Sequence, residues 1–140
     1  MERHGLLFAL FAAFLWGLAP VFEKLGLIRI SPLVGLTIRN IAITIIVLII
    51  ALFTNVGKEI VHADFKSVLF VVIGGIIAGL LGIWSYLEAL KHWEASRVVP
   101  IAGAYPLFAF ILSMVFLGEN LTLQKGIGVI LIVSGIVLLG

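Results

Sequence analysis

The sequence predicts an all-α membrane protein that crosses the bilayer five times. Of its 140 residues, 63% are hydrophobic and only 11% are charged, whereas a soluble domain carries about a quarter charged residues. The mean hydropathy is +1.32. Five apolar runs are each long enough to cross a hydrocarbon core of about 30 Å, which takes roughly 20 helical residues. We expect one domain over residues 1–140, because the chain is too short for a second one.

Several function classes are excluded by what the sequence lacks. There is no cysteine, which excludes a disulfide framework, a thiol redox site and a cysteine-ligated metal. The three histidines are scattered, so we expect no metal site and no cofactor. The net charge of +2 does not indicate nucleic-acid binding, since the basic residues are dispersed among apolar runs. No hydrolase triad, metalloprotease motif or nucleotide-binding glycine loop is present, so we do not expect an enzyme.

The apolar runs predict helices over 5–25, 33–54, 67–90, 97–117 and 121–140. The first run is longer than the apolar region of a signal peptide, so we interpret it as a retained helix. Before the second run, Ser31 is a predicted N-cap and Pro32 a first helical residue. The polar stretch 55–64 is expected to be an amphipathic surface loop, and residues 118–120 the last break. Loops this short place consecutive helices antiparallel and adjacent.

The basic residues do not define which side of the membrane the chain faces. With five spans, one side receives Arg3, Lys58, Lys66 and Lys125, and the other receives Lys24, Arg29, Lys91 and Arg97. Lysine and arginine bias sets orientation, and here it is four against four. Either one orientation is set by the first helix or by individual charges, or the chain inserts both ways and pairs head to tail. The second arrangement has the symmetry of inverted-repeat transporters.

The first run carries residues that are costly at membrane depth. Trp16, Gly17 and Pro20 combine a ring, a flexible residue and a helix breaker, and Glu23 and Lys24 follow one turn later. A proline inside a helix removes a hydrogen bond and costs on the order of 3 kcal/mol in water. Two interpretations stay open: a polar site with a kinked wall, or charges at the interface above a packing kink.

The second run contains Arg39, about two helical turns after Pro32. An unpaired arginine at mid-membrane costs about 2.5–3.5 kcal/mol on insertion scales. Arg39 either reaches the interface with its long side chain or points inward, where Glu23 or Glu88 would be its acidic partner.

The third run begins rich in glycine and ends polar. Gly75 and Gly79 form a small-xxx-small pair that allows close approach of another backbone. Trp84, Tyr86 and Glu88 follow, and each is either a cavity residue or part of a helix end. Lys91 and His92 lie three and four residues after Glu88 and are expected to form an exposed ion-pair ridge at the end of the helix.

The last two runs differ in character. Pro100, Gly103 and Pro106, with Tyr105, cannot form a regular helix, and such a segment is tolerated where it faces protein or a watery cavity. The alternative is a late helix start, with 97–103 as a loop. The final run has no charge beyond Lys125, and Gly128 and Gly135 share one face. We expect that face to pack within the bundle or against a second subunit.

The order of these motifs resembles an EamA domain, the repeat unit of the drug/metabolite transporter superfamily. The resemblance covers the whole chain. It is carried by Trp16-Gly17 with Lys24, Arg39-Asn40, Tyr86-Leu87-Glu88-Ala89-Leu90, Pro100 with Pro106, Leu117-Gly118-Glu119, Gln124, and Gly128 through Gly135. Most members resemble two such five-helix units fused in opposite orientations, so this chain would be one half of an inverted-repeat ten-helix architecture.

The resemblance implies a secondary transporter that exports or exchanges a small organic metabolite or drug by alternating access. The expected cavity residues are Trp16, Gly17, Pro20, Arg39, Trp84, Tyr86, Glu88, Pro100, Tyr105 and Pro106. Glu23 and Glu88 are the possible proton-coupling acids, because burial raises the pKa of a carboxyl.

The expected partners are a small-molecule substrate, the lipid bilayer and a second copy in an antiparallel homodimer, with Gly128 and Gly135 packing between subunits. The expected location is a prokaryotic inner membrane. Two alternatives stay open: one half of a heteromeric transporter with a paralogous partner, or a membrane assembly factor that transports nothing. A small multidrug-resistance exporter is similar in size, but such proteins have four helices and an acidic residue deep in the first.

Overall fold

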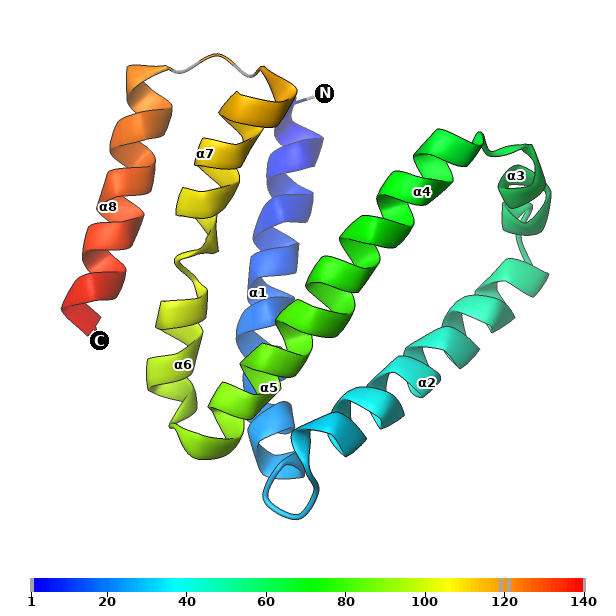
Figure 1. Ribbon diagram of the computed structural model, residues 1–140, viewed down its shortest axis with the longest axis horizontal. Helices are drawn as coiled ribbons and strands as arrows, with labels where there is room; N and C mark the ends of the chain where they lie inside the picture. Colours follow the sequence, from blue (N-terminus) through cyan, green and yellow to red (C-terminus); the bar gives the residue numbers. More distant parts are fainter. Residues whose placement is uncertain (1, 119, 121, 140) are drawn as a thin grey trace. The chain divides into compact units, whose positions relative to one another are not determined.

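The structure is a computed structural model that describes residues 2–118, 120 and 122–139, and the regular structure of these residues is helical (Figure 1). The elements are α1 (Glu2–Gly26), α2 (Pro32–Leu52), α3 (Val56–His62), α4 (Phe65–Gly74), a π-helical segment η1 (Gly75–Gly82), α5 (Ile83–His92), α6 (Ala95–Ala102), α7 (Tyr105–Leu117) and α8 (Leu123–Leu139).

Four helical segments are long and apolar enough to cross a membrane. They are His4–Gly26, Pro32–Leu52, Phe65–His92 and Ala95–Leu117, and they overlap the first four predicted runs. Helix α8 has 17 residues, or about 25 Å at 1.5 Å per residue, which is less than the roughly 30 Å of a hydrocarbon core. Residues 121 and 140 of the fifth predicted run lie outside the described residues. A multi-pass membrane protein is therefore shown, and the predicted fifth crossing is not.

The chain divides into two compact units, Phe22–His92 and Met1–Val21 together with Trp93–Gly140. Helix α1 belongs to both, since it continues without interruption through Pro20.

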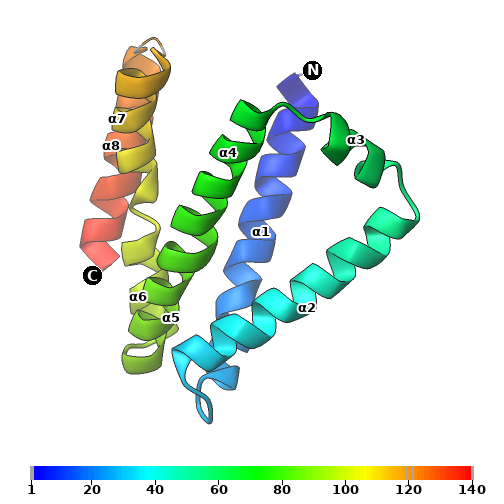
Figure 2. The same ribbon diagram turned by 45° about the vertical axis from the view of Figure 1, so that its right-hand side comes forward.

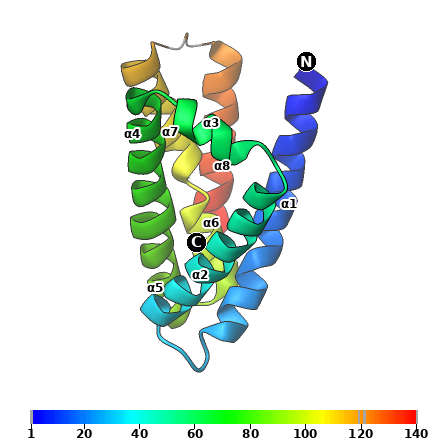
Figure 3. The ribbon, with the colours of Figure 1, turned by 90° about the vertical axis from the view of Figure 1, so that its right-hand side faces the viewer.

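The unit Phe22–His92 begins with a tight turn between α1 and α2 (Figure 3). The Ser31 hydroxyl accepts a hydrogen bond from the Val34 N–H at 3.4 Å, and Pro32 follows at the start of α2. The predicted cap is thereby confirmed. Helix α2 packs against α5 and diverges from α4 towards α3 (Figure 2).

The polar stretch between the second and third spans is more ordered than the sequence predicts. The expected loop over 55–64 contains helix α3, so the loop assignment is wrong for Val56–His62. Asp64 then caps α4: its Oδ1 accepts a hydrogen bond from the Ser67 N–H at 3.0 Å. This hydrogen bonding with Ser67 holds the pKa of the exposed Asp64 carboxyl below its ordinary value.

The glycine-rich part of the third span is wound as the π-helix η1, which is uncommon beyond a single turn. A Cβ placed at Gly75 or Gly79 would meet no described atom within 4 Å, apart from the local helix backbone. Within the unit Phe22–His92, the expected close approach of another backbone is therefore not made at these glycines.

In the other unit, α6 and α7 are two pieces of one span, broken at Gly103 and Ala104 (Figure 1). Pro106 has no N–H to donate back to the preceding turn and disfavours helical geometry at the residue before it. The predicted break is confirmed. The alternative of a loop over 97–103 is wrong, because Ala95–Ala102 is helical. Helix α7 ends at Gly118 with a φ of 64°, and α8 packs against both pieces.

Candidate functional site

A small apolar core fixes the end of α1, the turn 27–31, the start of α2 and α5 in the unit Phe22–His92. Leu27, Leu36, Leu87 and Leu90 are buried there. The turn packs closely over the start of α2, since a Cβ at Gly35 would lie 3.4 Å from Cδ2 of Leu27, in van der Waals contact. Because a packed core holds its side chains in fixed rotamers, the polar groups at its edge are held on a rigid frame.

Two lysines tie the helix ends of this core together. The Lys24 ammonium, in the last turn of α1, donates to the carbonyl of Leu90 in the last turn of α5 at 2.6 Å. The Lys91 ammonium donates to the carbonyl of Leu27 and to that of Ile30 at 3.1 Å. The last carbonyls of a helix have no intrahelical partner and carry partial negative charge. The lysine at the end of α1 thus satisfies a carbonyl of α5, and the lysine at the end of α5 satisfies carbonyls of the turn that follows α1.

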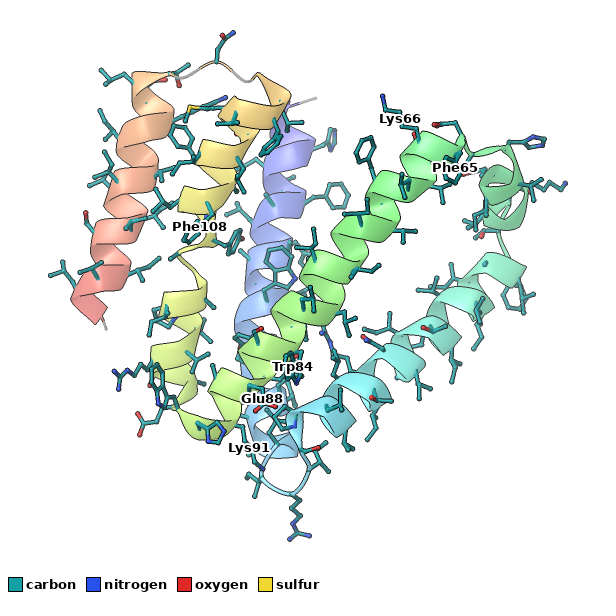
Figure 4. The ribbon with its side chains drawn as sticks, in the orientation of Figure 1. Phe65, Lys66, Trp84, Glu88, Lys91 and Phe108 are labelled. Atoms are coloured by element: carbon teal, nitrogen blue, oxygen red, sulfur yellow. The ribbon has the colours of Figure 1, made fainter. Side chains whose placement is uncertain are left out.

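The lysine arrangement corrects one expectation and adds a feature that the sequence did not predict. Lys91 is not an exposed member of an ion-pair ridge, because its side chain is half-buried and donates to backbone. His92 and Glu88 do approach one another, at 3.9 Å, at the exposed edge of α5. Figure 4 shows Trp84, Glu88 and Lys91 along α5. A lysine in the last turn of a helix indicates that its ammonium group caps backbone carbonyls. The sequence does not indicate which helix or turn supplies those carbonyls.

Glu23 and Arg39 meet beside this core. Arg39 Nε lies 3.9 Å from Glu23 Oε1, and the two side chains are 38% and 19% exposed. Of the two acids that the sequence offers to Arg39, Glu23 is the one it contacts. The distance is an ion-pair distance but exceeds that of a hydrogen bond, about 2.7–3.2 Å.

Tyr86 brings a third polar group to the same place. It lies on the face of α5 that carries Leu90, one turn away. Its hydroxyl is buried and has no hydrogen-bond partner among the described residues. The Glu23 carboxylate is close enough to interact electrostatically with it. A buried hydroxyl without a partner is uncommon and calls for an explanation.

The other unit holds the remaining expected site residues. Pro20 is buried and Trp16 is 65% exposed. Pro100 and Pro106 are half-buried on either side of the α6–α7 break, and Tyr105 is exposed at the start of α7. These residues and Gly17 belong to this unit, whereas Glu23, Arg39, Trp84, Tyr86 and Glu88 belong to the unit Phe22–His92.

Among the described residues, no group of three or more histidine, aspartate or glutamate side chains is arranged to hold an ion. The glycines of α8 are open: a Cβ at Gly128 or Gly135 would meet no described atom within 4 Å, apart from the local helix backbone. The notable chemistry of the described chain is thus a set of charges and hydroxyls on membrane-crossing helices.

These features define a multi-pass helical membrane protein with polar groups held between its spans. Residues 3–140 match the EamA-like transporter family. The chain belongs to this family, within the drug/metabolite transporter superfamily, and its membership indicates a transporter rather than an enzyme.

The relatives fall into two lengths. An uncharacterized transporter of a Sinorhizobium species is 29% identical over 139 residues, covering 99% of this chain and 98% of the relative. An uncharacterized protein of Methanocaldococcus jannaschii is 35% identical over 135 residues, covering 96% and 92%. A Salmonella typhimurium protein named "Probable amino-acid metabolite efflux pump" is 26% identical over 144 residues, covering 97% of this chain but 48% of the relative. No solved structure matches the chain.

Proposed function

We propose that this chain is a secondary transporter that exports or exchanges a small organic metabolite or drug, and that it works as an antiparallel homodimer. The observation that carries the proposal is the length of the relatives. The chain matches about half of the Salmonella relative but nearly all of the Sinorhizobium one. Among the relatives, such a unit thus occurs both alone and as half of a longer protein. Two copies of a single unit would together provide the same helices as one of the longer proteins.

The balanced basic residues support two orientations. Lysine and arginine bias sets the orientation of a membrane protein, and the expected five-span topology leaves four on each side. Two copies of opposite orientation are related by a two-fold axis in the membrane plane, which places their helices as in inverted-repeat transporters. The open glycine face of α8, with Gly128 and Gly135, is the surface we assign to subunit packing.

Alternating access would come from rocking of the two subunits around a shared cavity in a prokaryotic inner membrane. The broken helix at Pro100 and Pro106 supports this mechanism, because non-helical backbone at membrane depth is tolerated where it lines protein or water. Trp16, Gly17 and Pro20 would form a further wall. Bacterial and archaeal relatives support the prokaryotic location.

Disulfide mapping along α8 tests the dimer, and the chain suits it because it has no native cysteine. Single cysteines would be placed at successive α8 positions and mixed pairwise in membranes. In an antiparallel pair, the residue numbers that cross-link sum to a constant, whereas in a parallel pair each position links to its own copy. The first pattern, together with a C-terminal topology reporter found on both sides, is the expected result. Self-links in the parallel pattern, a single orientation, or links only to a different protein would each overturn the homodimer.

Proton coupling is proposed to involve Glu23 or Glu88. Replacing both with glutamine should abolish solute movement driven by a pH gradient in proteoliposomes while leaving downhill exchange measurable. Transport that still follows the pH gradient in the double variant would remove these acids from the mechanism.

A further inference from the structure

The third span changes its winding partway along its length. The N–H of Gly75 donates to carbonyls three and four residues earlier, whereas the N–H of Ile83 donates to the carbonyl of Ala78, five residues earlier. The wide turns extend over the eight residues Gly75–Gly82, while π-helical turns in proteins are mostly single. The π form of this segment therefore competes with an α-helical form of the same leucine, isoleucine and alanine residues.

Gly82 is the position at which the π form excludes a larger side chain. A Cβ there would lie 3.2 Å from the carbonyl oxygen of Ile77, five residues earlier, which is closer than ordinary van der Waals contact. Gly79 in the same segment has no such neighbour within 4 Å. In an α-helix alanine is more favourable than glycine. An alanine at position 82 should therefore favour the α form over the π form, whereas an alanine at position 79 is compatible with both.

The two ends of η1 join parts of the unit Phe22–His92 that are held very differently (Figure 2). On one side, α5 is anchored by the buried Leu87 and Leu90 and by the contacts of Lys91 with the turn after α1. The Ser85 hydroxyl also fastens α5 to the last turn of η1, since it donates to the carbonyl of Leu81 at 2.8 Å. On the other side, none of the described residues of α3 and α4 is buried. A change of winding in η1 would therefore move α4 and leave α5 in place.

Helix α4 is built so that it can turn about its own axis. After Ser67 its residues are all apolar, so lipid can contact any of its faces and a turn brings no charge into the hydrocarbon core. Lys66 lies in the first turn of α4, where a long side chain keeps its ammonium group in water. Helix α3 is joined to its neighbours by the non-helical residues 53–55 and 63–64, and such links are where backbone dihedrals change when an element moves.

We propose that η1 is a rotary joint, which interconverts between the π form and an α form and thereby turns α4 about its axis relative to the fixed α5. A π turn contains about one residue more than an α turn, so rewinding one turn rotates α4 by roughly 100°. Side-chain ends about 5–6 Å from the helix axis then move by about 8 Å. The face of α4 that a neighbouring helix meets thus differs between the two forms. This movement takes place within one unit and is distinct from the rocking of two subunits.

Distances between pairs of spin labels on the full chain in nanodiscs test the joint. The chain has no native cysteine, and dilution with unlabelled chain restricts the measurement to distances within one molecule. Ile38→Cys, on the helix α2 that packs against α5, is the fixed reference. It is paired in turn with Leu69→Cys and Val71→Cys, two exposed positions that lie on nearly opposite faces of α4. The pair of Ile38→Cys with His92→Cys is the control, because both labels lie on the fixed side of η1.

We expect two distances for each α4 pair and one for the control pair. Between the two forms the distance should lengthen at one α4 label and shorten at the other, because a rotation moves opposite faces in opposite directions. Gly82→Ala should remove one of the two distances at both labels, whereas Gly79→Ala, the matched control, should keep both. A single distance for the α4 pairs without either glycine substitution overturns the proposal, and this result does not depend on whether Gly82→Ala folds. Changes of the same sign at both labels, which indicate tilting, or an equal response to both glycine variants would overturn it as well.

Discussion

Replacing Lys91 with methionine should destabilise the chain, because the Lys91 ammonium donates to two backbone carbonyls. Methionine keeps most of the apolar length of the side chain and removes the ammonium group. Lys91→Met would leave the carbonyls of Leu27 and Ile30 without their charged donor.

The size of the effect follows from the number of bonds. Polar contacts inside membrane proteins average about 0.6 kcal/mol and reach about 1.7 kcal/mol, while hydrogen bonds to charged groups in soluble proteins contribute about 1.5–3 kcal/mol. Two such contacts at about 0.6–1.7 kcal/mol each give an expected loss of about 1–3 kcal/mol for Lys91→Met.

The assay is reversible unfolding of the purified chain in mixed micelles by a titration with dodecyl sulfate, followed by circular dichroism. Lys58→Met is the matched control, because Lys58 is an exposed residue of α3 and surface substitutions usually change stability by less than about 0.5 kcal/mol. The reasoning is refuted if Lys91→Met leaves the unfolding midpoint as unchanged as Lys58→Met does.

Three further outcomes are expected in the same assay. Gly118→Ala should destabilise the end of α7 by about 1–2 kcal/mol, because its φ of 64° is left-handed and unfavourable for a residue with a Cβ; an unchanged midpoint would contradict this. The Asp64 cap should give a pH-dependent contribution: its carboxyl pKa is lowered in the folded chain by the hydrogen bonding with Ser67, so the stabilisation is complete above the unfolded pKa and is lost as the pH falls through the folded one. Asp64→Ser, which keeps a capping oxygen, should remove that acid dependence, and a profile identical to that of the wild type would count against the cap. Leu90→Ala, at a fully buried position, should cost about 2 kcal/mol or more through the cavity it leaves, whereas Leu48→Ala on an exposed helix face should cost far less; equal costs would refute the buried core.

The sequence predicted the membrane-crossing helices well where apolar length and helix breakers decide the outcome. Pro32 starts α2, and Pro106 follows the break in the fourth span, because proline acts through local backbone geometry. Helix α3 was not predicted, since seven mixed residues show no clear period. The π-helix η1 was not predicted either. A uniformly apolar run does not indicate whether a helix has 3.6 residues per turn or more.

The candidate site was predicted only as a set of residue types. Arg39 needed an acid, and two were available at suitable positions; only the packing of α1 against neighbouring elements of its unit selects Glu23. The lysine contacts are harder to predict, because Lys91 reaches carbonyls 61 and 64 residues away in the chain. Backbone acceptors are the same at every residue, so no pattern in the sequence identifies the partners of a capping lysine.

Lys24 and Lys91 count towards the basic residues that set membrane orientation, and they also donate to backbone carbonyls. Mutations designed to change the orientation of this protein must take both roles into account. Charge-bias mutagenesis normally deletes lysines or arginines from one side and follows the change in topology. Here, deleting either lysine would also release helix-end carbonyls, so reduced yield or degradation could be mistaken for an orientation effect. Arg97 is also engaged, 4.4 Å from the Trp93 ring. Lys24, Lys91 and Arg97 are expected on the same side of the membrane as Arg29. Of these four residues, the exposed Arg29 can be removed with the least structural cost. A variant with a fixed orientation should therefore begin with the replacement of Arg29.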